Sequence, residues 1–117
     1  MRAAIYVRTS TIDQKPENQI EPCKKLALSR GYEIEGIYIE RLSGYKDISR
    51  PEYEKIKNKA HLGEINAVVC WALDRWVRNR DTLIEDVSSL KSCGCNIHTV
   101  KDAWLEAINI EGPLDKL

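Results

Sequence analysis

Seven consecutive residues at positions 67–73, with the sequence AVVCWAL, are apolar or aromatic, and this run limits the possible folds more than any other feature of the chain. An uninterrupted apolar run of this length is typical of a central parallel strand that is covered on both faces. The run is far too short to span a bilayer, and the N-terminus has no signal-peptide pattern. We therefore expect a cytoplasmic α/β protein built around this strand.

Strand-like and helix-like segments alternate along the chain. Strands are predicted at residues 2–7, 32–39, 67–73 and 96–100, and helices at about 15–30, 51–62 and 82–94. Each strand and helix unit spans about 25 to 30 residues, a spacing that implies right-handed crossovers. The sequence thus predicts an α/β fold, with a mostly parallel central sheet and helices on both faces.

Proline, glycine and capping residues mark where these helices begin and end. Gly31 is expected to end the first helix, and Pro22 is expected in its first turns. Pro51 fits the first turn of the second helix, whereas Thr82 and Glu85 match a capping box at the start of the third. Alternation along strand 32–39 predicts three residues on one face and two on the other, namely Ile34, Gly36 and Tyr38 against Ile37 and Ile39.

The size and charge of the chain exclude some classes of protein. Its 117 residues correspond to one domain, and its formal net charge is zero because 18 basic residues balance 18 acidic ones. A neutral chain has no general attraction for a polyanion, so phosphate binding has to come from clustered arginines. The four cysteines include no C-x-x-C pair and are interpreted as structural thiols, and His61 and His98 as structural histidines. No cofactor and no metal is predicted.

Polar residues follow several of the predicted strands. In a parallel sheet the carboxyl ends of the strands share one edge, so the loops that leave them are expected to converge there. This edge would bring the hydroxyl of Ser10 together with the guanidinium groups of Arg8, Arg50, Arg75 and Arg78, beside the carboxylate of Asp74 and the loop that contains Ser43. Guanidinium groups pair with phosphate oxygens and stay charged, so the cluster predicts a phosphate site.

Ser10 is the candidate nucleophile of this site. A serine among arginines is suited to attack phosphorus, but no histidine stands beside it in the sequence, which argues against a Ser-His-Asp triad. Simpler interpretations remain open at this point. Ser10 could cap a turn, Arg75 and Arg78 could be solvated, and Trp76 could either pack or stack on a base.

The ordered motifs resemble a known family. They cover roughly residues 2–115 and read Tyr6-x-Arg8-x-Ser10-Thr11-x-x-Gln14, Gln19, Ser43-Gly44, Arg50-Pro51 and Leu73-Asp74-Arg75-x-x-Arg78. In order and spacing they resemble the catalytic domain of the serine recombinases, the resolvase and invertase group. The resemblance implies a two-step phosphoryl transfer on DNA that needs neither a metal nor a nucleotide.

The resemblance also implies a role for each matched residue. Ser10 would attack the scissile phosphodiester and form a 5′-phosphoserine link, which strand exchange and religation then resolve. Arg8, Arg75 and Arg78 would hold the non-bridging oxygens, with Arg50 joining them, and Asp74 would orient an arginine. The supporting residues would be Tyr6, Gln14, Gln19, Ser43 and Lys59. The partners would be double-stranded DNA and further copies of the chain, as a dimer and a synaptic tetramer of the full-length protein.

The chain departs from the family pattern in three places. Trp76-Val77 replaces a smaller pair such as Leu-Gly, and Glu64 stands where an aspartate is common. The family continues into a long assembly helix and a DNA-binding domain, so residues 1–117 are expected to be the catalytic domain alone, to bind DNA poorly by itself and to hold Ser10 away from the arginines.

Two classes of function other than a recombinase are also considered for this sequence. A non-catalytic assembly or regulatory domain could share the fold, although the intact Ser10 and arginine set argues against it. A nucleotide-binding or phospho-acceptor domain would need a glycine-rich phosphate loop or an acidic cluster, and the sequence contains neither.

Overall fold

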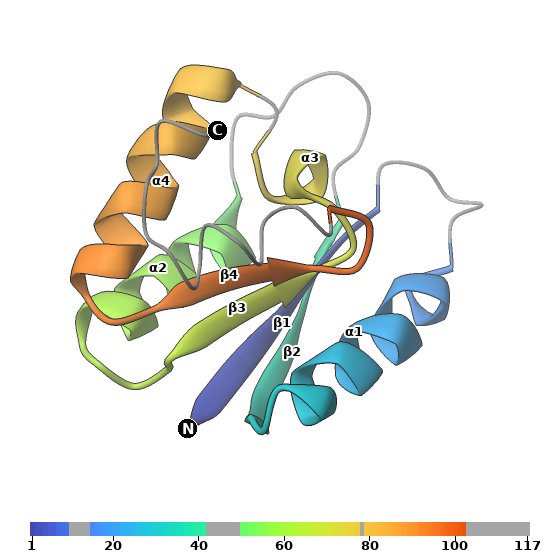
Figure 1. Cartoon of the computed structure of the whole chain (residues 1–117). Coiled ribbons are helices and arrows are strands. Elements are labelled where there is room, and N and C mark those ends of the chain that lie inside the picture. The colour runs from blue at the N-terminus through green and yellow to red at the C-terminus, as the bar shows by residue number, and fades with distance from the viewer. Residues whose placement is uncertain (10–14, 42–49, 78, 103–117) are drawn as a thin grey trace.

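Four parallel strands form one sheet in the order β2-β1-β3-β4 in the computed structural model, which describes residues 1–9, 15–41, 50–77 and 79–102 (Figure 1). The strands are β1 (Arg2–Thr9), β2 (Glu33–Arg41), β3 (Ala67–Cys70) and β4 (Asn96–Thr99). The helices are α1 (Glu17–Ser29), α2 (Pro51–His61), α3 (Leu73–Trp76) and α4 (Arg80–Ser92). The predicted α/β fold with a parallel sheet is confirmed.

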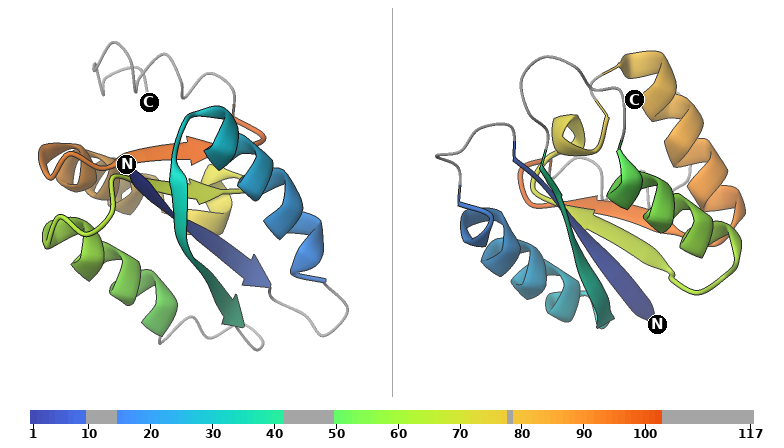
Figure 2. Two further views of the ribbon diagram at one scale, coloured as in Figure 1. Left: turned by 90° about the horizontal axis from the view of Figure 1, so that it is seen from below. Right: turned by 180° about the vertical axis from the view of Figure 1, so that it is seen from behind.

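Helices cover both faces of the sheet. Helix α1 lies on one face, and α2 and α4 lie on the other, as the two views of Figure 2 show. Strand β1 supplies alternate residues to the two cores, with Ile5 and Val7 packed on the α1 side and Tyr6 on the α2 side. β3 is buried along its whole length, as its apolar sequence predicts. In the described part of the chain, no helix combines the length and the apolar character of a membrane span.

Strand β2 contains an extra residue that changes its faces. The register with β1 shifts so that Ala3 pairs with Ile34 and Ala4 with Gly36, which leaves Glu35 as a bulge. The predicted simple alternation is therefore wrong for this strand. Ile34 packs on the α1 side together with Ile39, whereas Tyr38 packs on the opposite side.

Strand β3 ends earlier than its apolar sequence predicts. It stops at Cys70, and residues 73–76 form the single turn α3 instead of the end of the strand. Asp102 accounts for this turn, because its Oδ2 accepts hydrogen bonds from the backbone nitrogen of Leu73 at 2.8 Å and from the hydroxyl of Thr99 at 3.1 Å. A residue beyond the end of β4 thus fixes the segment that follows β3.

Helix boundaries agree with the sequence signals at α2 and differ at α4. Pro51 opens α2 as predicted, and Pro22 lies in the second turn of α1. The predicted capping box is wrong, because α4 begins at Arg80 and is capped by Asn79, whose side-chain oxygen accepts a 3.0 Å hydrogen bond from the backbone nitrogen of Thr82. Thr82 therefore lies inside the first turn, and its backbone N–H donates the capping hydrogen bond to Asn79.

Candidate active site

The hydroxyl of Tyr6 links several charged groups near the carboxyl end of β1. It accepts a 2.8 Å hydrogen bond from Nη2 of Arg50 and donates a 3.4 Å hydrogen bond to Oε1 of Glu40. Burial raises the pKa of Tyr6 to about 12, although the charges of Arg50 and Arg8 act to lower it. Tyr6 therefore stays protonated at neutral pH and serves as a fixed hydrogen-bonding group, not as a base.

Arg50 lies just before α2 and reaches across to α3. Its Nη2 also donates to the backbone carbonyl of Trp76, and its guanidinium carbon lies 4.0 Å from the ring centroid of Tyr53. Within the described residues, no carboxylate forms an ion pair with Arg50, and its buried Nε has no hydrogen-bond partner. Arg50 is thus a fixed cation that no acidic side chain of the described residues pairs with.

Glu40 is a buried carboxylate at this site that the sequence reasoning missed. Only 3% of the residue is exposed, and its oxygens accept hydrogen bonds from the backbone nitrogens of Glu52 at 3.4 Å and Tyr53 at 3.1 Å. These nitrogens belong to the first turn of α2, where the helix dipole favours a negative charge. An acidic residue at the end of a strand, on the same face as Tyr38, was the available signal.

Arg8 and Gln19 meet at the end of β1. Arg8 belongs to the strand, not to the loop in which the sequence placed it, and 3% of it is exposed. Nε2 of Gln19, from the first turn of α1, donates a 3.1 Å hydrogen bond to the carbonyl of Arg8. The end of β1 is thereby tied to α1 at the point where the segment with Ser10 begins.

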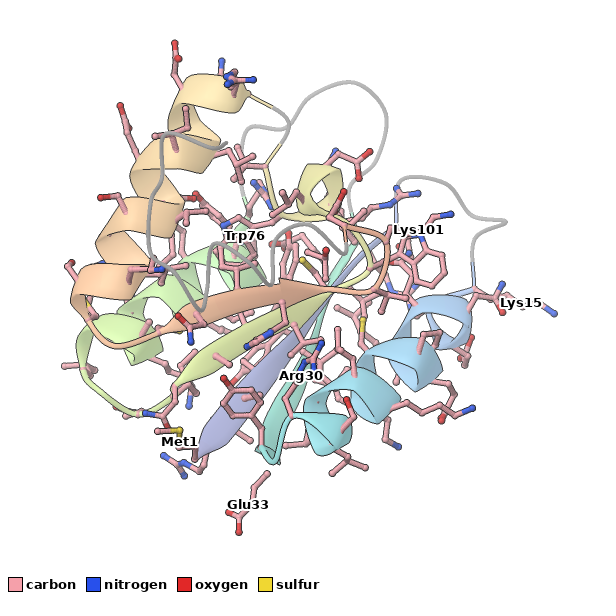
Figure 3. All side chains as sticks on the ribbon, viewed as in Figure 1. Met1, Lys15, Arg30, Glu33, Trp76 and Lys101 are labelled. Carbon is pink, nitrogen blue, oxygen red and sulfur yellow. The ribbon has the colours of Figure 1, made fainter. Side chains whose placement is uncertain are left out.

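Asp74 and Arg75 lie on the α3 turn. Asp74 is exposed and makes no ion pair within the part of the chain that the structure describes. Arg75 is half-buried, and its buried Nε has no hydrogen-bond partner. Trp76, the next residue, is fully buried on the α2 and α4 side of the sheet (Figure 3).

Lys59 lies apart from this edge. It comes from the third turn of α2, and its Nζ pairs with Glu35 at 2.8 Å and with Glu64 at 3.6 Å. Burial alone would raise the pKa of Glu35, but the hydrogen bonds from Lys59 and Tyr38 hold it below its usual value. The structure therefore gives Lys59 ion-pair partners near the start of β2 and does not bring it together with the arginines.

Three of the predicted arginines lie near the carboxyl ends of β1 and β3. Arg8 lies near the end of β1, and Arg75 lies on the α3 turn that follows β3. Arg50 contacts both segments, through Tyr6 of β1 and Trp76 of α3. Four predicted site residues lie outside the described residues, namely Ser10, Gln14, Ser43 and Arg78. The expected distance between Ser10 and the arginines is therefore still a prediction.

The thiols and histidines lie outside this cluster. Cys23, Cys70 and Cys95 are fully buried, as predicted, and burial raises the pKa of Cys23 and Cys95 to about 12. Cys93 is the C-cap residue of α4 and, contrary to the predicted burial, is only half-buried, with its Sγ 3.1 Å from Nδ1 of His61. His98 is buried and contacts the hydroxyl of Tyr32 at 3.0 Å. Among the described residues, no three acidic, histidine or cysteine side chains group as metal ligands.

Comparison with known proteins gives consistent matches. Residues 3–117 match the family described as "Resolvase, N terminal domain". The chain is 35% identical over 97 residues to the transposon Tn21 resolvase of Escherichia coli, a match that covers 83% of this chain and 46% of that protein. A resolvase of Clostridium perfringens is 29% identical over 101 residues, with 86% and 50% covered. The chain thus spans about half the length of these relatives.

Solved structures share the fold. The C-terminal catalytic domain of ISC1926 TnpA, an IS607-like serine recombinase, has a TM-score of 0.75 at 24% identity, covering 94% of this chain and 79% of that one. The N-terminal catalytic domain of TP901-1 integrase also has a TM-score of 0.75, at 20% identity, with 95% of each chain covered. At these identities the likeness concerns the fold alone.

Proposed function

This chain belongs to the resolvase N-terminal domain family, and we propose that it is the catalytic domain of a serine site-specific DNA recombinase. The family match and the fold support this proposal. So does the arrangement of basic residues at the carboxyl edge of a parallel sheet, which is where α/β proteins bind their ligands. The proposed substrate is a phosphodiester of double-stranded DNA.

One observation carries the proposal furthest. Arg50 and Arg75 have no carboxylate partner among the described residues, and the buried Nε of each lacks a hydrogen-bond partner. Desolvated donors of this kind are costly unless an anion satisfies them. A phosphodiester, with its two non-bridging oxygens, supplies the acceptors that planar guanidinium groups prefer.

In the proposed reaction, Oγ of Ser10 attacks the scissile phosphorus. A bond forms between this oxygen and phosphorus as the serine hydroxyl gives up its proton, the bond to the 3′ oxygen breaks, and the departing 3′ oxygen takes up a proton, so the number of protons is unchanged. The products are a 5′-phosphoserine link and a free 3′-hydroxyl. Attack by a 3′-hydroxyl on that link reverses the chemistry and rejoins the strand. The number of phosphodiester-type bonds is unchanged, so no external energy source is required.

Arginines would stabilise the charge that builds up during this step. Arg8, Arg50, Arg75 and Arg78 are proposed to bind the equatorial oxygens of the pentavalent transition state, where fixed cations contribute most. Asp74 is proposed to orient one of these arginines once DNA is bound. Tyr6 would hold Arg50, and Gln19 would hold the end of β1. Gln14, Ser43 and Lys59 keep their predicted supporting roles as proposals.

Assembly and tight DNA binding are proposed to need more than residues 1–117. The relatives are about twice as long as the matched region, and this chain has no net positive charge to attract DNA. We propose that residues 1–117 supply the chemistry, and that the dimer and the synaptic tetramer form in the full-length protein.

A suicide substrate tests the proposed function. This is a duplex that carries the recombination site and is nicked so that the cleaved end diffuses away and cannot be rejoined. The full-length protein should form a covalent protein–DNA adduct, Ser10→Ala should form none, and Ser29→Ala, which removes an exposed hydroxyl at the end of α1, should match wild type. DNA binding without any adduct in wild type would instead favour an assembly domain.

A further inference from the structure

The guanidinium of Arg50 lies over the ring of Tyr53 and donates a hydrogen bond to the backbone carbonyl of Trp76. We propose that Tyr53 and Trp76 are positioning residues that hold Arg50 at the carboxyl edge of the sheet before DNA arrives. We call this pair the aromatic clamp. The inference rests on the proposed function, because the clamp would act on the reaction only through Arg50.

Tyr53 provides the surface on which the guanidinium rests. The guanidinium carbon of Arg50 lies 4.0 Å from its ring centroid, well within the range of a cation–π contact. The ring is itself fixed, because the Tyr53 hydroxyl donates a hydrogen bond to Oδ2 of Asp86 on α4. Nζ of Lys57 pairs with the other oxygen of Asp86 at 3.3 Å. Only 6% of Tyr53 is exposed, so the contact is shielded from water.

Trp76 completes the clamp from α3. Its backbone carbonyl accepts a hydrogen bond from Nη2 of Arg50, and its indole packs against two tyrosines. The ring centroids are 4.7 Å apart for Tyr53 and 5.2 Å apart for Tyr6, and the Tyr6 contact is edge-to-face. Trp76 is fully buried. A change in its side chain would therefore disturb both the Tyr53 ring and the carbonyl that Arg50 uses.

The chemistry of the clamp suits a phosphate-binding arginine. A carboxylate would fix Arg50 by neutralising it, and the fixed residue would then attract an anion weakly. Aromatic faces, a hydroxyl and a carbonyl hold a guanidinium while leaving its positive charge in place. Nη2 is used by Tyr6 and Trp76, whereas the buried Nε has no hydrogen-bond partner, so a ligand would bind Arg50 through Nε or Nη1.

A purely structural role for the two rings makes different predictions. Tyr53→Phe and Trp76→Phe keep an aromatic face, whereas Tyr53→Leu and Trp76→Leu keep apolar volume without one. If the clamp positions Arg50, the leucine variants lose its function and the phenylalanine variants keep most of it. If the rings only fill the core, the cleavage rate of each variant follows its loss of stability, whether or not the variant keeps an aromatic ring.

Nuclear magnetic resonance of the Arg50 side chain tests the clamp without any need for activity. In the full-length protein, the Nε–H signal of Arg50, assigned by its loss in Arg50→Lys, should show a ring-current shift. The shift should persist in Tyr53→Phe and become clearly smaller in Tyr53→Leu, where only the Tyr6 ring, 5.5 Å from the guanidinium carbon, remains, at temperatures where both variants are folded. A signal that is the same in wild type and Tyr53→Leu would overturn the clamp.

Single-turnover cleavage of the suicide substrate tests its role in the reaction. Tyr53→Leu should slow cleavage on the order of 10- to 100-fold when Arg50 is present. In an Arg50→Ala background, Tyr53→Leu should slow cleavage by less than about twofold. The effects of two substitutions depart from additivity only when the two residues are coupled. Equal losses in both backgrounds would overturn the positioning role alone. Wild-type cleavage by Arg50→Ala would overturn that role together with the part of Arg50 in the proposed function.

Discussion

Oε1 of Glu40 accepts a 3.1 Å hydrogen bond from the backbone nitrogen of Tyr53. This contact joins the end of β2 to the first turn of α2, where Arg50 is the capping position. A carboxylate at the positive end of the helix is favoured by the helix dipole and by the unpaired N–H groups there. Glu40 therefore stabilises the start of α2 and, with it, the position of Arg50.

Glu40→Ala should destabilise the fold by about 2–3 kcal/mol, because it leaves buried N–H groups without an acceptor. Glu40→Gln keeps one acceptor oxygen and should cost less, about 1 kcal/mol. Urea denaturation at pH 7 measures both values. Glu33→Ala removes an exposed carboxylate from the start of β2 and should stay within about 0.5 kcal/mol of wild type. Equal stabilities for the Glu33 and Glu40 variants would contradict the capping role.

Arg8→Ala and Arg75→Ala should each reduce single-turnover cleavage on the order of 10²- to 10³-fold, because each removes a cation from the place where charge develops. Substrate binding should change much less than the rate. Arg30→Ala, which removes an exposed arginine at the end of α1, is the matched control and should cleave like wild type. Near-normal rates in both site variants would show that the transition state lies elsewhere.

Asn79→Ala should destabilise the protein by about 1 kcal/mol, because Asn79 caps α4. Thr82→Ala should have a smaller effect, since the side chain of Thr82 is not the cap. Thermal unfolding of the two variants compares them directly. A larger loss for Thr82→Ala would restore the capping box that the sequence predicts.

Stability should fall as the pH rises above 9. Burial raises the pKa of Cys23 to about 12 from its ordinary value of 9.0. Between these values the unfolded chain binds fewer protons than the folded one, so the stabilisation present below pH 9 is lost as the pH increases. Cys23 alone should account for about 1.4 kcal/mol by pH 10.

Urea denaturation at pH 8 and pH 10 checks this alkaline loss. The difference between the two pH values should shrink by about 1.4 kcal/mol in Cys23→Ala. Ser92→Ala, which removes an exposed group that does not titrate, should retain the full difference. The same alkaline loss in Cys23→Ala and wild type would show that this thiol is not protected by burial.

The fold follows from local features of the sequence to a large extent. The apolar run that contains β3, the proline that opens α2 and the glycines after the helices each act within a few residues. For this reason the order of elements and the parallel sheet could be predicted. Arg8, Arg50 and Arg75 were placed at one edge by the same logic, because strand ends in a parallel sheet lie together.

Other features depend on partners that are distant in sequence. The α3 turn requires Asp102, the bulge at Glu35 requires a particular register with β1, and the role of Glu40 requires the first turn of α2. Spacing along one segment carries no information about such contacts. The aromatic clamp is of the same kind, because Tyr53 and Trp76 are separated in sequence and meet only in the folded chain.

Identification of the DNA-linked residue tests the central claim most directly. The full-length protein would be trapped on its suicide substrate, digested with nuclease and protease, and analysed by tandem mass spectrometry. We predict one modified peptide, with the nucleotide attached to Ser10 through a 5′ phosphate and a free 3′-hydroxyl on the partner strand. Attachment to another residue, or through a 3′ phosphate, would contradict the assignment of Ser10 as the nucleophile.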